Sequence, residues 1–140
     1  MDNWRSLERF FSAQETDYAV ALEEVRRGSK ESHWMWYIFP QLRSLGQSNM
    51  SWFFGIEDLE EARAYLEHPV LGSRLREITQ AALDLPGCNA RAIFGSPDHM
   101  KLRSCMTLFN LVSEDDLFQK VLDKFYGGQL DPRTMELSKR

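Results

Sequence analysis

The chain has 140 residues, of which 43% are hydrophobic and 27% charged, and its formal net charge is -4. This length and balance are typical of one folded domain with a single core, and they exclude an intrinsically disordered chain. The negative charge, with no basic run longer than Arg26-Arg27, argues against nucleic acid as a partner.

The N-terminal part of the chain carries two helix patterns and two ambiguous apolar runs. One helix is predicted to begin near Asn3 and a second to run from about Thr16 to Arg27, where Gly28 supplies a left-handed stop. The apolar run 34–39 is predicted to be helical, whereas the run 52–56 fits a buried helix or a buried strand alike. The polar loop between the two runs is compatible with the turn of a small β-hairpin.

The central part of the chain shows clearer boundaries. Asp58 and Glu61 form a capping box that opens a helix, and His68-Pro69 closes it. An apolar stripe from Leu71 to Leu85 then predicts a surface helix packed on a core, ended by Pro86-Gly87.

Four further helices are expected in the C-terminal part, and proline and glycine mark most of their ends. They are a short helix 90–94 stopped by Gly95, a long helix through Val112 with Ser96-Pro97 as cap and first turn, a helix opened by Ser113 with Asp116 and ended by Gly127-Gly128, and a last helix from Asp131-Pro132 through Leu137.

Together these elements predict an all-α fold, a compact multihelical single domain over residues 1–140. The alternative is a mostly α fold with one small β-hairpin within 34–56. We expect the segment Trp34 to Phe39 to be buried centrally against the helices that carry Leu71 to Leu85 and Leu102 to Val112.

Neither a membrane span nor an export signal is evident. The longest apolar run, 34–40, is far shorter than the roughly 20 residues that cross a bilayer, and residues 1–4 lack the basic and apolar regions of a signal peptide. We therefore expect a cytoplasmic protein that does not bind membranes. In that reducing compartment Cys88 and Cys105 are expected to be free thiols.

One candidate site lies in the segment 28–41, where polar side chains alternate with aromatic rings. If this segment is helical from about Ser32, then Lys30, His33 and Gln41 fall near one face, with Trp36 among the rings around them. Flat apolar surface beside a few fixed donors suits a pocket for a small polar or anionic ligand. The competing interpretation is that the rings are core residues and that the histidine is a hydrogen-bonded core residue beside them. This is the more common situation in small domains.

A second candidate group follows Pro97, where Asp98, Lys101 and Ser104 are spaced three apart on one helix. Asp98 and Lys101 can pair, although the helix dipole alone also explains an acidic residue in a first turn. If the two groups converge, they place a histidine, a carboxylate, two lysines and a hydroxyl in one site.

No catalytic residue is assigned from the sequence. Nucleotide-binding glycine motifs, a G-x-S-x-G elbow and metal-ligating histidine pairs are absent from it, and no cofactor or metal is implied. Cys105 lies on an apolar stripe and is expected to be inert. Whether the protein is an enzyme, and its oligomeric state, stay open at this point.

Several longer sequence motifs of the chain resemble those of a bacterial family of unknown function. They are the pattern G-x-K-x-[SG]-H-W-M-W-x-I-F-P-Q at 28–41, His68-Pro69-Val70-Leu71-Gly72, Ile93-Phe94-Gly95, the segment from Asp98 to Phe109, and Phe125-Tyr126-Gly127-Gly128. The resemblance spans nearly the whole chain and implies a small multihelical fold without an established reaction. Some members bear the label calpastatin, an inhibitor that is largely unstructured, unlike a chain with this apolar content.

The leading hypothesis is a small-molecule-binding domain, with or without catalysis, whose pocket is lined by Lys30, His33, Trp36, Gln41, Asp98, Lys101 and Ser104. The alternative is a protein-protein interaction module without a catalytic site. The first hypothesis requires these side chains to converge, whereas the second predicts an exposed apolar patch.

Overall fold

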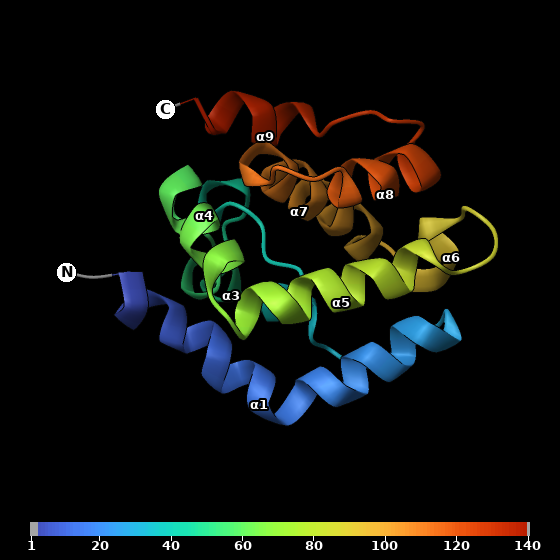
Figure 1. Cartoon of the computed structure of the whole chain (residues 1–140), viewed down its shortest axis with the longest axis horizontal. Coiled ribbons are helices and arrows are strands. Elements are labelled where there is room, and N and C mark those ends of the chain that lie inside the picture. Colours follow the sequence, from blue (N-terminus) through green and yellow to red (C-terminus); the bar gives the residue numbers. More distant parts are fainter. Residues whose placement is uncertain (1–2, 140) are drawn as a thin grey trace.

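Helix α5 (Leu71–Leu83) lies at the centre of the arrangement, between α1 (Asn3–Arg27) on one side and α8 (Leu117–Tyr126) on the other (Figure 1). Helix α7 (Asp98–Val112) packs against α8 and also against α4 (Leu59–Glu67). The computed structural model describes residues 3–139 of the chain and the side chains of residues 7–139. Within this part the fold is a compact all-α domain, as predicted.

The remaining elements are short and lie between or after the long helices. They are α2 (Met35–Ile38), a 3-10 turn η1 (Arg43–Leu45), α3 (Asn49–Phe53), α6 (Ala90–Phe94) and α9 (Pro132–Leu137). None of the helices in the described part of the chain combines the length and apolarity that a bilayer crossing requires.

Helix α1 is continuous, which corrects the prediction of two helices with a boundary near Thr16. The polar stretch before Thr16 continues the helix because Gln14 is buried there and its side-chain amide donates to Tyr37 O and to the Tyr65 hydroxyl. Figure 1 shows a bend near the middle of α1. Thr16 Oγ1 donates to Ala13 O, a type of bond that often bends helices.

The segment 34–56 contains no hairpin in its described backbone. Its one β feature is an isolated parallel bridge, in which Arg43 N donates to Ile56 O and Ile56 N donates to Gln41 O. Gly55 permits this close approach, since a Cβ there would lie 2.3 Å from Arg43 Cα. The second apolar run is therefore divided, with its start in α3 and its end in the bridge.

The burial of the tryptophan-rich segment is confirmed, because Trp34 and Phe39 are each only 1% exposed. Its main helical neighbour is α1, not α5 or α7 as we expected. The reason is the hydrogen bond from Gln14 on α1 to the carbonyl of Tyr37, which fixes α2 against that helix. Phe39 also packs edge-on against Phe94 of α6.

Two predicted helix caps differ from those observed. Ser96 does not cap α7, whose N-cap is Pro97, because backbone carbonyls accept from the first N–H groups of the helix, Gly95 O from His99 N among them. The predicted cap of α8, Ser113, lies before the helix and accepts from Asp115 N, and the observed N-cap Asp116 makes no side-chain capping bond. Asp115 accepts from Leu117 N instead.

Candidate functional site

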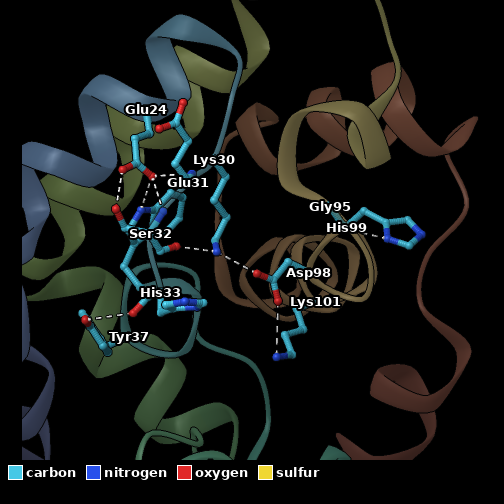
Figure 2. A network of polar contacts seen from close by, with 11 residues as sticks. Glu24, Lys30, Glu31, Ser32, His33, Tyr37, Gly95, Asp98, His99 and Lys101 are labelled. Atoms are coloured by element: carbon cyan, nitrogen blue, oxygen red, sulfur yellow. Dashed lines mark hydrogen bonds and ion pairs between the residues drawn. The ribbon is translucent and has the colours of Figure 1, made fainter.

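An ion cluster formed by Lys30, Asp98 and Lys101 joins the loop after α1 to the first turn of α7 (Figure 2). Lys30 Nζ lies 2.9 Å from Asp98 Oδ2, and Lys101 Nζ lies 3.4 Å from Asp98 Oδ1. The Lys30 side chain is only 8% exposed, whereas those of Asp98 and Lys101 are each 20% exposed. The two candidate groups of the sequence thus meet at one carboxylate.

Aromatic rings support both ammonium groups of the ion cluster. Lys101 Nζ lies 3.6 Å from the centre of the half-buried Trp36 ring, and Lys30 Nζ lies 5.0 Å from that of the buried Trp34 ring. Both distances are within the range of cation–π attraction. The cluster is therefore held by rings as well as by opposite charge.

Glu24 of α1 fixes the loop that carries Lys30. Its Oε1 accepts from Glu31 N, Ser32 N and the indole N–H of Trp34, and its Oε2 accepts from the Ser32 hydroxyl. Burial alone would raise the pKa of this carboxyl, but the hydrogen bonds outweigh burial and lower its pKa to about 2. Glu24 is therefore ionised at neutral pH.

His33 and Gln41, both predicted site residues, lie outside this hydrogen-bonded network. His33 is exposed, and within the described residues no hydrogen bond or ion pair joins its side chain to the ion cluster. The side-chain nitrogen of Gln41 faces Gly46 and makes no hydrogen bond to the ion cluster within the described residues. The structure thus brings together Lys30, Trp36, Asp98 and Lys101, and in the part of the chain that it describes it joins neither the His33 nor the Gln41 side chain to them by a hydrogen bond or ion pair.

Ser104 makes no hydrogen bond to the ion cluster among the described residues and instead links two helices. Its hydroxyl donates to Asp131 Oδ2, the carboxylate that caps α9 by accepting from Thr134 N. The bond therefore connects α7 to α9. Ser104 is 9% exposed.

Neither the Ser32 hydroxyl nor the Cys105 thiol is activated as a nucleophile. Ser32 donates to Glu24, but a carboxyl with a pKa of about 2 is a poor general base. Cys105 is fully buried, and burial raises the pKa of its thiol well above the usual value, whereas Cys88 is exposed. Among the residues that the structure describes, no group of three or more His, Cys, Asp or Glu could hold a metal ion.

Three surface hollows lie away from the ion cluster. The first, of about 260 Å³, is mostly apolar and is lined by Leu7, Glu8, Phe11, His68 and Val70. The second, of about 350 Å³, lies between α4, α5 and the end of α7, and the third, of about 250 Å³, lies beside the C-terminal end of α9. Helix α3 also exposes a cluster of large apolar side chains, which are Met50, Trp52 and Phe53.

Sequence reasoning missed Glu24. In the sequence it follows Glu23 on a helix of mixed charge, where a solvent-exposed acid is the usual expectation. Only the return of the chain at Glu31 to Trp34 makes it a buried acceptor. A local pattern could not have shown this contact.

Comparisons with known proteins place the chain in a group without an assigned activity. A family model described as "Protein of unknown function (DUF1810)" matches residues 4–138. The crystal structure of the conserved hypothetical protein Rv1873 from Mycobacterium tuberculosis is similar, with 46% sequence identity, a TM-score of 0.93 and 96% of each chain covered. No curated protein matches the chain.

Proposed function

We propose that this chain, which belongs to the DUF1810 family of proteins of unknown function, is a cytosolic small-molecule-binding domain that takes an anionic ligand at the ion cluster. The observation that carries the proposal is that Lys30 and Lys101 share the single carboxylate of Asp98. Two positive charges and one negative charge leave the cluster a net charge of +1, in a chain whose net charge is -4. An anion is therefore the complementary ligand.

Lys101 is the group in the cluster with donors to spare. Lys30 is nearly buried, and its ammonium group already contacts Asp98 Oδ2, Ser32 O and the Trp34 ring. Lys101 has three N–H donors and contacts only Asp98 Oδ1, at 3.4 Å, and the face of Trp36 in the described part of the chain. An anion on the solvent side of Lys101 would use those donors.

Binding, not catalysis, is the function that the arrangement favours. The Ser32 hydroxyl and the Cys105 thiol are not activated as nucleophiles, and each oxygen of the Asp98 carboxylate is already paired with an ammonium group. A carboxylate with both oxygens paired in this way serves to orient its cations.

A thermal-shift screen tests the proposal with inorganic phosphate, nucleotides, sugar phosphates and amino acids. A ligand at 100 times its Kd should stabilise the protein by about 2.7 kcal/mol. Lys101→Met should abolish the shift because it keeps an apolar stem on Trp36 and removes the charge. Lys120→Met, at an exposed lysine paired with Asp116, is the matched control and should keep it. Equal shifts in both variants, or no shift with any anion, would contradict the proposal.

The second candidate function is a protein-protein interaction module, and the exposed apolar cluster of α3 favours it. Met50, Trp52 and Phe53 are 42%, 63% and 49% exposed. Replacing Trp52 and Phe53 together by serine should then weaken self-association or partner binding in sedimentation experiments. The same double variant should leave the anion-dependent thermal shift unchanged if the first candidate holds.

A further inference from the structure

We infer that Glu24 is the positioning residue of the proposed anion site, although it does not touch the ligand. The inference rests on the proposed function. It states that a carboxylate on a different helix determines the position of the Lys101 ammonium group. Glu24 is 4% exposed and belongs to α1, whereas Lys101 belongs to α7. The connection runs through the loop 29–34 and the ion cluster.

Glu24 acts first on the two groups that hold the Lys30 ammonium in place. The Lys30 ammonium group donates to Ser32 O at 2.6 Å and lies over the Trp34 ring. Glu24 holds both supports, because it accepts from Ser32 N at 3.0 Å and from the Trp34 indole at 2.8 Å. The Glu24 carboxylate thus positions both groups that the Lys30 ammonium contacts, the backbone of Ser32 and the ring of Trp34.

The second step is from Lys30 to Lys101. Lys30 Nζ holds Asp98 Oδ2, and the other oxygen of the same carboxylate holds Lys101 Nζ (Figure 2). If Lys30 moves, Asp98 loses its nearest cation and is free to turn toward Lys101. The ammonium group of Lys101 would then be more tightly neutralised and less available to an external anion.

The role requires a carboxylate and not an amide. Glu24 accepts four hydrogen bonds, one of them from the Ser32 hydroxyl at 2.6 Å. A glutamine keeps one oxygen acceptor and places an NH₂ donor group where a second acceptor is needed. Glu24→Gln should therefore release part of the loop while preserving side-chain size.

Glu61 offers a matched control, since it is also a glutamate that is 4% exposed. It pairs with Arg9 and accepts from Glu57 N, and neither contact involves the ion cluster. Glu61→Gln should lower stability without altering the proposed site. A comparison of the two variants therefore separates positioning from general stability.

The test measures the Kd for inorganic phosphate and the side-chain NMR signals of Lys30 and Lys101 at a temperature where every variant is folded. We expect Glu24→Gln to weaken phosphate binding on the order of tenfold and to shift both lysine signals. Glu24→Asp should recover part of the affinity, and Glu61→Gln should change neither quantity. If wild-type protein binds no phosphate, the proposed function fails, and the lysine signals still decide the positioning role. Unchanged lysine signals in Glu24→Gln, or equal effects of Glu24→Gln and Glu61→Gln, would overturn the inference.

Discussion

Lys30 and Asp98, far apart in the sequence, form an ion pair with 2.9 Å between Nζ and Oδ2 at the point where the loop after α1 meets the start of α7. The lysine is almost completely covered, and the aspartate is the charged partner that permits its burial. The pair therefore ties the N-terminal half of the fold to α7 and also forms the base of the proposed site.

Asp98→Asn should destabilise the protein more than a typical surface substitution. The substitution leaves the buried Lys30 charge without its partner, and we expect a loss of about 3 kcal/mol in the free energy of unfolding. This value is at the lower end of the range for buried ion pairs, because the Asp98 side chain is still 20% exposed. Urea unfolding measures the loss. Asp116→Asn, which breaks the exposed pair with Lys120, should cost less than about 0.5 kcal/mol. Similar losses for both variants would show that the Lys30–Asp98 pair is not a buried one in solution.

The acid stability of the protein should reflect Glu24. Its folded pKa of about 2 lies below its usual value of 4.5, so its contribution is fully present above pH 4.5 and is lost as the pH falls toward 2. The free energy of unfolding of wild type should therefore exceed that of Glu24→Gln at neutral pH. This difference should shrink as the pH falls through that window. A difference that is independent of pH would contradict the four hydrogen bonds assigned to the ionised carboxylate.

Ser104→Ala should affect α9 and not the proposed site. The substitution removes the bond from Ser104 to Asp131 and costs about 1 kcal/mol, the usual net value of such a bond. Hydrogen exchange of the α9 amides should become faster, while the affinity for an anion stays that of wild type. If Ser104→Ala instead weakens anion binding with α9 unchanged, the hydroxyl belongs to the ligand site as the sequence predicted.

The parts of the fold that the sequence predicts well are those with local signals. Asp58 accepts from Glu61 N at the start of α4, and Asp131 with Pro132 opens α9, as their spacing indicates. The continuity of α1 has no local signal. It depends on Gln14, whose partners Tyr37 and Tyr65 come from distant parts of the chain.

The same distinction applies to the candidate site. The sequence indicates Lys30, Asp98 and Lys101 because polar groups stand beside aromatic residues or at helix spacing, and tertiary structure brings them together. The sequence does not indicate Glu24, because its burial arises only when the loop after α1 folds back on it. Sequence patterns thus indicate which residues carry charge near a core, but not which carboxylate organises them.

NMR signals of the tryptophan indole N–H groups, followed during a titration with inorganic phosphate, test the central claim most directly. Trp36 lies under Lys101, whereas Trp52 is exposed on α3 and contacts Arg43. An anion bound at the ion cluster should move the Trp36 signal in a saturable way and leave Trp52 unchanged. A saturable shift of Trp52 alone, or no shift of Trp36 at any phosphate concentration, would contradict an anion site at Lys101.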